Sequence, residues 1–176
     1  MTCALFIGRF QPFHNAHLKA IKDILKENSK INIIIGSSQE KCTKLNPFSY
    51  KERREMINLV LKVNKIKSYR IVPILDVYND KKWVELIDKK VKEYDSVYTG
   101  NEWTERCFLR YGKKVRKIKL IRGISSTNVR NKIKNREEWK KLVPREVYSY
   151  IKKIEGDKRI KNINWHGFKH RNSNSL

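Results

Sequence analysis

Three side chains of types that can bind phosphate, Arg9, His14 and His17, lie close together near the start of the sequence. The two histidines are three residues apart, a spacing that places them on one face of a helical turn. An apolar run at residues 3–7 precedes them, and apolar residues at helical spacing follow, so we expect a turn from a strand into a helix. The first N–H groups of a helix and the positive end of its dipole attract anions. The residues therefore predict a phosphate site at this turn.

A second pattern of this kind lies at residues 123–130, where three hydroxyl side chains precede an arginine. Ser126 or Thr127 is expected to cap the helix that follows, and Arg130, one turn inside that helix, reaches the same point. Taken alone, the pattern also fits an ordinary helix start with an exposed arginine. Its occurrence together with the first pattern favours a ligand site.

Strands and helices alternate along the chain in the manner of a parallel sheet. Strands are predicted at residues 3–7, 31–35, 69–75, 96–99 and 115–121, separated by helical patterns of about 10–15 residues. Right-handed crossovers would then cover both faces of the sheet with helices. The fold class is α/β: a Rossmann-like single domain with a five-stranded parallel sheet and a helical C-terminal region. Polar turns follow four predicted strands at the edge where such sheets bind ligands: Gly8, Gly36, Asp76 and Gly100.

The domain is expected to span residues 1–156. Ser49 and Glu52 form a capping-box pattern that predicts a helix start. Further helices are predicted over residues 137–142 and from Pro144, a favoured first helical position, to a stop at Gly156. Residues 157–176 are basic and rich in Asn and Ser without periodicity, so we expect a basic C-terminal tail.

The composition is strongly basic, with 41 Lys and Arg against 18 Asp and Glu and a formal net charge of +23. Such a charge attracts nucleotides, nucleic acids and acidic membrane surfaces alike. The densest basic run, residues 113–122, contains six basic residues and no acidic one. It lacks the interleaved aromatic residues of single-strand binders, so nucleic-acid binding there is the less favoured interpretation.

The three cysteines, Cys3, Cys42 and Cys107, are odd in number and widely spaced. They indicate reduced thiols rather than a disulfide framework or a zinc site. No apolar run reaches the roughly 20 residues that a membrane span needs, and the first residues do not resemble a signal peptide. We expect a cytoplasmic protein with no membrane partner.

Residues 8–17, Gly-Arg-Phe-Gln-Pro-Phe-His-x-x-His, resemble the signature of the (T/H)xGH nucleotidyltransferase superfamily. The form is that of archaeal-type nicotinamide mononucleotide adenylyltransferases. Residues 124–130, Ile-Ser-Ser-Thr-x-x-Arg, resemble the second signature of the superfamily and follow the last predicted strand, as expected. Ala16 stands where the first signature usually has Gly, a difference that bears on how closely the backbone approaches a phosphate. The resemblance extends over about residues 3–156.

The resemblance implies that the phosphate of nicotinamide mononucleotide (NMN) attacks the α-phosphorus of ATP, which forms NAD and releases pyrophosphate. The nucleophile is already an anion, so catalysis must come from alignment and charge stabilisation. The residues implied as catalytic are Arg9, His14, His17 and Arg130. Those implied for ATP binding are Gly8, Arg9, Phe10, His14, His17, Gly100, Asn101, Ser125, Ser126, Thr127 and Arg130. Those implied for NMN binding are Ser37, Asp76 and Trp83.

The Trp83 indole would stack on the cationic nicotinamide ring, and the alternative is a core residue on an amphipathic helix. Mg²⁺ is expected to arrive with ATP, because the sequence shows no dedicated carboxylate cage, and no metal ligand is predicted. The resemblance also implies a homo-oligomer.

Several alternatives stay open at this point. The acceptor could be nicotinic acid mononucleotide or phosphopantetheine, or the chain could be a cytidylyltransferase of the same superfamily. A non-catalytic nucleic-acid-binding module on this fold is the alternative from a different class. The absence of a Walker lysine loop and of Gly-x-Gly-x-x-Gly argues against P-loop enzymes and ordinary dehydrogenases.

Overall fold

The computed structural model describes residues 2–119 and 121–163 of the chain. Five parallel strands form one sheet in the order β3-β2-β1-β4-β5. Their bounds are Cys3–Gly8 (β1), Lys30–Ile35 (β2), Tyr69–Pro73 (β3), Ser96–Thr99 (β4) and Val115–Lys117 (β5). The predicted five-stranded, Rossmann-like α/β fold is confirmed. Because the strand order reverses beside β1, the point where this fold binds ligands lies at the carboxyl end of β1.

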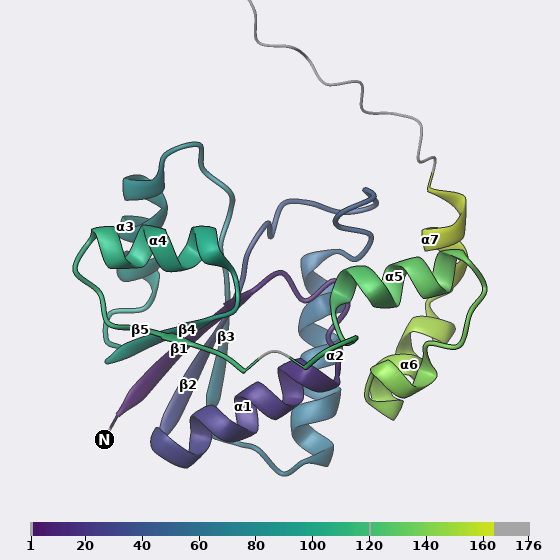
Figure 1. Cartoon of the computed structure of the whole chain (residues 1–176), viewed down its shortest axis with the longest axis horizontal. Coiled ribbons are helices and arrows are strands. Elements are labelled where there is room, and N and C mark those ends of the chain that lie inside the picture. Colours follow the sequence, from purple (N-terminus) through teal and green to yellow (C-terminus); the bar gives the residue numbers. More distant parts are fainter. Residues whose placement is uncertain (1, 120, 164–176) are drawn as a thin grey trace, which may run out of the picture.

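Helices cover both faces of the sheet, as Figure 1 shows. Helices α1 (Asn15–Glu27) and α2 (Tyr50–Val63) pack on one face, and α3 (Asp80–Lys90) and α4 (Glu102–Arg110) on the other. Successive side chains of a strand point to opposite faces. In β1, accordingly, Ala4 and Phe6 join the core beneath α1 and α2, whereas Leu5 and Ile7 join the core beneath α3 and α4. No helix in the described part of the chain is long and apolar enough to cross a bilayer.

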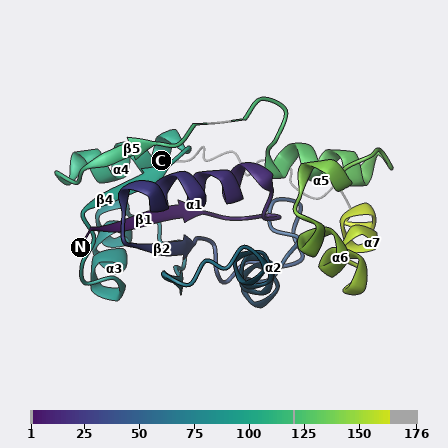
Figure 2. The same cartoon turned by 90° about the horizontal axis from the view of Figure 1, so that it is seen from below.

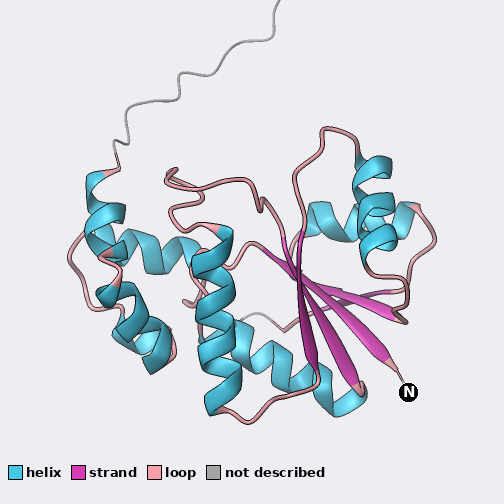
Figure 3. Ribbon diagram, turned by 180° about the vertical axis from the view of Figure 1, so that it is seen from behind, coloured by secondary structure: helices cyan, strands magenta, loops and turns pink. Residues whose placement is uncertain are grey.

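The C-terminal helices gather beyond the carboxyl ends of the strands (Figure 2). They are α5 (Ser126–Lys134), a 3₁₀ turn η1 (Lys140–Leu142), α6 (Arg145–Lys153) and α7 (Gly156–Asn162). Helix α2 lies between them and the sheet (Figure 3), and α6 packs on it through Val147 and Ile151. The helix predicted at residues 137–142 is only the short turn η1. Pro144, predicted as the first residue of the next helix, is instead the N-cap residue of α6.

The expected irregular tail from residue 157 is wrong over residues 157–162, which form α7. Glu155 adopts a left-handed conformation with φ of 53°, which ends α6 and starts a new helix. Gly156 is required there, because a Cβ atom at this position would lie 2.6 Å from the Phe48 ring. Arg159 of α7 then donates two hydrogen bonds of 2.8 and 2.9 Å to the carboxylate of Glu52. Residues 164–176 of the expected tail lie outside the described residues.

Strand β5 is shorter than predicted, three residues instead of seven. Its partner β4 ends at Thr99, whose carbonyl accepts the last bond, from Ile118 N–H at 3.1 Å. A strand cannot extend beyond the end of the partner strand that forms hydrogen bonds with its backbone N–H and C=O groups. Leu120, within the predicted strand, lies outside the described residues. The capping box at the start of α2 is confirmed: the Ser49 N–H donates to the Glu52 carboxylate at 2.7 Å, and the Glu52 N–H donates to Ser49 Oγ at 3.3 Å.

Candidate active site

The polar turns that follow the strands lie together at the carboxyl edge of the sheet, as predicted. The Gly36 N–H donates to the Gly8 carbonyl oxygen at 3.0 Å, which joins the ends of β1 and β2. Ser38 N–H donates to the Ile74 carbonyl at 3.0 Å and so adds the end of β3. The N-terminus of α1 begins at the same edge, just after β1. Backbone groups and side chains from distant parts of the sequence therefore converge where an α/β sheet binds its ligand.

The two histidines stack on each other at the start of α1. Their ring centroids are 3.5 Å apart with an interplanar angle of 14°. His14 occupies the N-cap position, and its backbone N–H donates to His17 Nδ1 at 3.2 Å. Because Nδ1 of His17 accepts this bond, neutral His17 carries its proton on Nε2. The geometry thus leaves His17 with a hydrogen-bond donor for an anion.

Burial keeps both histidines uncharged in the absence of a ligand. Desolvation lowers the pKa of His14 to about 4. The pKa of His17 is also held well below its usual value, by burial first and then by repulsion from His14. A neutral imidazole donates one hydrogen bond without bringing a full charge into the site. The pair therefore offers donors to a phosphate while the positive charge comes from arginines.

Aromatic rings enclose His17. The ring centroids of Phe10 and Phe13 lie 4.7 and 5.3 Å from that of His17. Phe10 itself is buried, so its side chain belongs to the core and leaves only its backbone for the predicted contact with ATP. Its ring also explains Gly8, since a Cβ atom there would lie 3.0 Å from the Phe10 ring. Gly8 thus serves packing at the turn.

The second motif docks directly on the first. Arg130, which is 5% exposed, donates to the Gln11 carbonyl at 2.7 Å and to Thr127 Oγ1 at 3.3 Å. Ser126 Oγ donates to the Pro12 carbonyl at 3.0 Å. The expected cap at Ser126 or Thr127 is wrong: Ser125 caps α5 by accepting the Asn128 N–H at 3.1 Å. The cap moves back one residue because Ser126 is used to hold the first motif.

Two buried side-chain nitrogens in the described part of the chain have no hydrogen-bond partner, His14 Nδ1 and Arg130 Nε. A buried polar atom without a partner costs about 1–3 kcal/mol, so such atoms are rare and need an explanation. Both belong to residues that the sequence places in the phosphate site. A bound anion would supply the missing partner.

Arg53 of α2 is a site residue whose role the sequence reasoning missed. Its side chain is fully buried, and its guanidinium donates to the carbonyl oxygens of Arg9 (2.9 Å), Gly36 (2.8 Å) and Ser37 (2.9 Å). It therefore ties the ends of β1 and β2 to α2. A signal was present, since Arg53 lies three and four residues before Met56 and Ile57 on the apolar face of the helix.

Three guanidinium groups concentrate positive charge at this edge. Burial and then the charge of Arg9 lower the pKa of both Arg53 and Arg130 to about 10. None of the three arginines forms a salt bridge with a carboxylate among residues 2–119 and 121–163. Arginines that are not neutralised by acids create a field that favours a polyphosphate.

Gln11 is a second residue whose role the sequence did not indicate. Its buried side-chain amide pairs with the backbone of Phe48 as a strand would: Nε2 donates to the Phe48 carbonyl at 2.8 Å, and Oε1 accepts the Phe48 N–H at 3.0 Å. The loop before α2 is thereby fixed to the turn that carries the histidines.

Ser37 and Asp76, both predicted to bind NMN, are brought together. The Ser37 N–H donates to Asp76 Oδ1 at 3.2 Å, and Gln39 Nε2 donates to Asp76 Oδ2 at 3.3 Å. Gly100 and Asn101 follow β4 at the same edge, as predicted. The Asn101 side chain is occupied as the cap of α4, where it accepts the Thr104 N–H at 2.9 Å.

The Trp83 side chain, predicted to stack on the nicotinamide ring, is buried in the core. It is 3% exposed and lies in the core beneath α3 and α4, with its ring 4.8 Å from Trp103 and 5.8 Å from Phe108 between centroids. The structure thus agrees with the alternative, a core tryptophan on an amphipathic helix. Trp103, which is 41% exposed, is the more accessible indole of the pair.

Comparison with known proteins identifies the family of the chain. The profile of the cytidylyltransferase-like family matches residues 5–132. The nicotinamide-nucleotide adenylyltransferase of Methanococcus aeolicus is 41% identical over 163 residues, which cover 92% of this chain and 94% of the relative. The chain belongs to the nicotinamide-nucleotide adenylyltransferase branch of this cytidylyltransferase-like family. A further member of the branch, from Picrophilus torridus, is 38% identical over 162 residues, 91% of this chain and 96% of the relative.

Solved structures show the same fold for this family. A bifunctional NMN adenylyltransferase/ADP ribose pyrophosphatase from Francisella tularensis superposes with a TM-score of 0.81 at 25% identity, over 92% of this chain and 52% of that one. A structure of the same bifunctional protein with AMP and a manganese ion gives a TM-score of 0.78 over 91% of this chain. This chain spans about half the length of those enzymes.

Proposed function

We propose that this chain catalyses the nicotinamide-nucleotide adenylyltransferase reaction, in which the phosphate of NMN attacks the α-phosphorus of ATP to give NAD and pyrophosphate. The observation that carries the proposal is the junction of the two motifs. There, the unpartnered nitrogens of His14 and Arg130 and three guanidinium groups meet at the carboxyl edge of the sheet. The family to which the chain belongs supports the same reaction.

The nucleophile needs no general base, since a phosphate is an anion at neutral pH. The histidines act instead as fixed donors: His17 Nε2–H and the neutral His14 ring hold oxygens of the ATP phosphates as charge moves to the leaving pyrophosphate. Because burial keeps their pKa values low, they need no deprotonation before ATP binds.

Arginines supply the charge. Arg9 and Arg130 are proposed to neutralise the triphosphate, with help from the N–H groups around Ser125, Ser126 and Thr127 at the start of α5. Arg53 touches no substrate in this proposal. It is a positioning residue, because its three bonds to carbonyls hold Arg9 and Ser37 in place.

In this proposal Mg²⁺ arrives bound to ATP, as part of the substrate MgATP. Within residues 2–119 and 121–163, no three His, Cys, Asp or Glu side chains come together as a metal-binding group. The side chains of the site are cationic or imidazole, a set that favours phosphate over a free Mg²⁺ ion, whose preferred ligands are oxygen atoms. The predicted cytoplasmic location and homo-oligomer stay predictions.

The test is pyrophosphate release from MgATP with NMN, nicotinic acid mononucleotide and phosphopantetheine as separate acceptors. We expect turnover with a pyridine mononucleotide and a loss of about 10²–10³ in kcat for His17→Ala, the size of effect known for a lost transition-state donor. Lys19→Ala, an exposed change on the same helix, is the matched control and keeps full activity. Turnover only with phosphopantetheine, or none with any acceptor, would contradict the proposal.

A further inference from the structure

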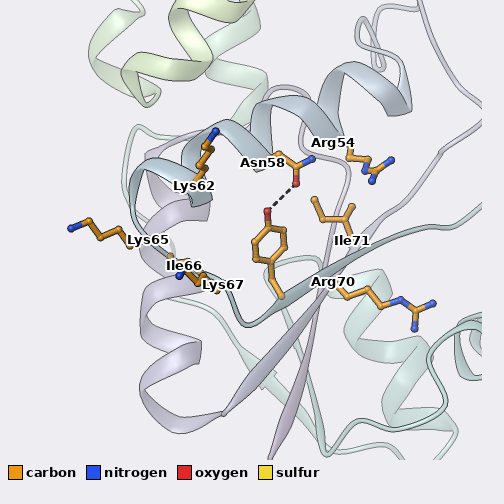
Figure 4. A pocket seen from close by; sticks show the side chains of 9 residues that line it. Arg54, Asn58, Lys62, Lys65, Ile66, Lys67, Arg70 and Ile71 are labelled. Atoms are coloured by element: carbon orange, nitrogen blue, oxygen red, sulfur yellow. Dashed lines mark hydrogen bonds between the residues drawn. The ribbon is translucent and has the colours of Figure 1, made fainter.

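A cavity lies away from the candidate active site, between α2, the loop that follows it and the edge strand β3 (Figure 4). Its volume is about 1120 Å³, and none of the predicted site residues lines it. Five of its nine lining residues are basic: Arg54, Lys62, Lys65, Lys67 and Arg70. We call this cavity the basic groove.

The charge of the basic groove is not simply the background of a lysine-rich chain. Lys and Arg make up 41 of 176 residues overall, but five of nine in the groove, which has no acidic residue. Two other cavities carry mixed charge. One combines Arg145 and Lys153 with Glu55 and Glu146, and the other is lined by Asp88, Lys92, Glu93, Asp95 and Lys113. Only this groove, among the three, presents a single sign.

The five cations of the basic groove are exposed and form no salt bridge with a carboxylate in the part of the chain that the structure describes. Lysines near the C-terminus of a helix interact favourably with its dipole, which accounts for Lys62. Charged side chains on an edge strand also prevent sheet-to-sheet pairing, which accounts for Arg70. Neither effect explains why cations from the helix, the loop and the strand line one groove.

The spacing of these cations suits a chain of phosphates rather than a single one. Arg54, Asn58 and Lys62 follow one another at four-residue intervals on α2, and Lys65 follows three residues later. At 1.5 Å per residue, the four-residue steps are about 6 Å each, so the row from Arg54 to Lys62 extends about 12 Å, and Lys65 lies just beyond the end of α2. A row of this length can follow several consecutive phosphates of an extended strand.

The floor of the basic groove offers surface for bases as well. Tyr69 is the first residue of β3, and its hydroxyl donates to Oδ1 of Asn58 on α2 at 3.1 Å (the dashed line in Figure 4). The half-buried side chains of Ile66 and Ile71 flank it. Basic grooves with an aromatic floor are typical of proteins that bind single strands, because cations hold the backbone and rings contact the bases. Inorganic polyphosphate would make no use of this floor.

We propose that the basic groove binds a short segment of single-stranded nucleic acid, with phosphates along the α2 row and bases against Tyr69. The site is separate from adenylyl transfer and does not depend on it. From the sequence alone, nucleic-acid binding at residues 113–122 is the less favoured interpretation of that basic run. The structure instead assigns it to α2 and β3.

The test is fluorescence anisotropy of a labelled twelve-residue single-stranded oligonucleotide with the full-length protein at several salt concentrations. The groove variant is K62Q/K65Q/R70Q. Its matched control is K22Q/K89Q/K161Q, three exposed lysines on α1, α3 and α7 whose replacement changes the net charge equally. We expect the groove variant to lose at least about tenfold in affinity and to lower the salt slope by about 2, since each phosphate contact on a single strand contributes about 0.7.

The control variant is expected to stay within about twofold of the wild-type affinity, and both variants to retain wild-type adenylyl transfer, which shows that they fold. Equal weakening by the two variants would mean that net charge alone attracts the strand, and the proposal would fail. An unchanged groove variant would also overturn it. Inorganic polyphosphate of matched charge serves as competitor. If it competes as well as the unlabelled oligonucleotide, the bases contribute nothing and the assignment to nucleic acid is wrong.

Discussion

The guanidinium of Arg130 donates a 2.7 Å hydrogen bond to the carbonyl oxygen of Gln11, 119 residues earlier in the chain. This bond joins α5 to the turn that carries the two histidines. The same side chain keeps one nitrogen, Nε, without a partner. Arg130 is thus both a structural tie between the motifs and a candidate ligand for phosphate, and the two roles are separable by substitution.

Replacement of Arg130 by Lys retains a cation but not the fork of donors. We expect kcat to fall by about 10²-fold or more, because the donors of a lysine all sit on one atom and do not reproduce the planar fork that would bond Gln11 and the proposed phosphate from different nitrogens. The free energy of unfolding should change far less, by about 1 kcal/mol for the lost bond. Steady-state kinetics and urea denaturation measure the two effects. A folded Arg130→Lys variant with wild-type kcat would refute the direct role.

Arg53 provides a prediction about positioning. Arg53→Met leaves the carbonyl oxygens of Arg9 and Gly36 without this donor, and the Ser37 carbonyl keeps only the Glu40 N–H, so we expect a loss of about 3 kcal/mol or more in unfolding free energy. That loss corresponds to a Tm lower by about 6–12 °C for a chain of this size. Arg53→Lys should recover part of the stability, yet KM for ATP should stay raised because Arg9 is no longer held. Wild-type kinetics in Arg53→Lys would show that Arg53 acts on stability alone.

The buried histidines predict a stability that depends on pH. The pKa of His14 in the folded protein is about 4, below the 6.5 of an unfolded chain. The unfolded state therefore binds more protons between these values, and stability is lost as pH falls from about 6.5 towards 4. From pH 7 to pH 5 we expect a loss of about 2 kcal/mol, with His17 adding to it in the same direction.

Urea denaturation at pH 7 and pH 5 checks this expectation. The buried or paired carboxylates Glu52 and Asp157 titrate below this window, since their pKa values are lowered, so they contribute little to the difference. The H14Q/H17Q variant should show a flatter dependence on pH than the wild type. A wild-type curve that is already flat between pH 7 and pH 5 would contradict the buried neutral pair.

The attachment of α7 gives a prediction about local stability. Arg159 bonds the Glu52 carboxylate twice and the Pro47 carbonyl at 3.0 Å, so Arg159→Ala should release the helix from the loop before α2. We expect a loss of about 1–2 kcal/mol and faster amide exchange in α7. Lys158→Ala, an exposed neighbour, is the matched control. Unchanged exchange in α7 would mean that its other contacts, such as Ile160 in the core and the Lys152–Asp157 ion pair, hold it.

The fold was predictable because each strand carries its own apolar run, and the alternation with helices leaves little choice of topology. The active-site turn was predictable because its residues are local in sequence. The role of Arg53 was not, since its burial depends on carbonyl groups 16 to 44 residues away. The length of β5 depends on its partner β4, and α7, at seven residues, is too short to show a period. The burial of Trp83 was not predictable for the same reason. It depends on Trp103, which lies on another helix and covers it.

The contact between Gln11 and Arg130 also sets an order for the synthesis of the protein. The ribosome delivers β1 with both histidines first, and the sheet through β4 is complete once residue 99 has emerged. The arginine proposed to complete the phosphate site comes 31 residues later, from position 130. A nascent chain stopped before α5 would therefore contain most of the sheet and both imidazoles without the second half of the site. The enzyme becomes competent only late in its translation, after most of its scaffold has been made.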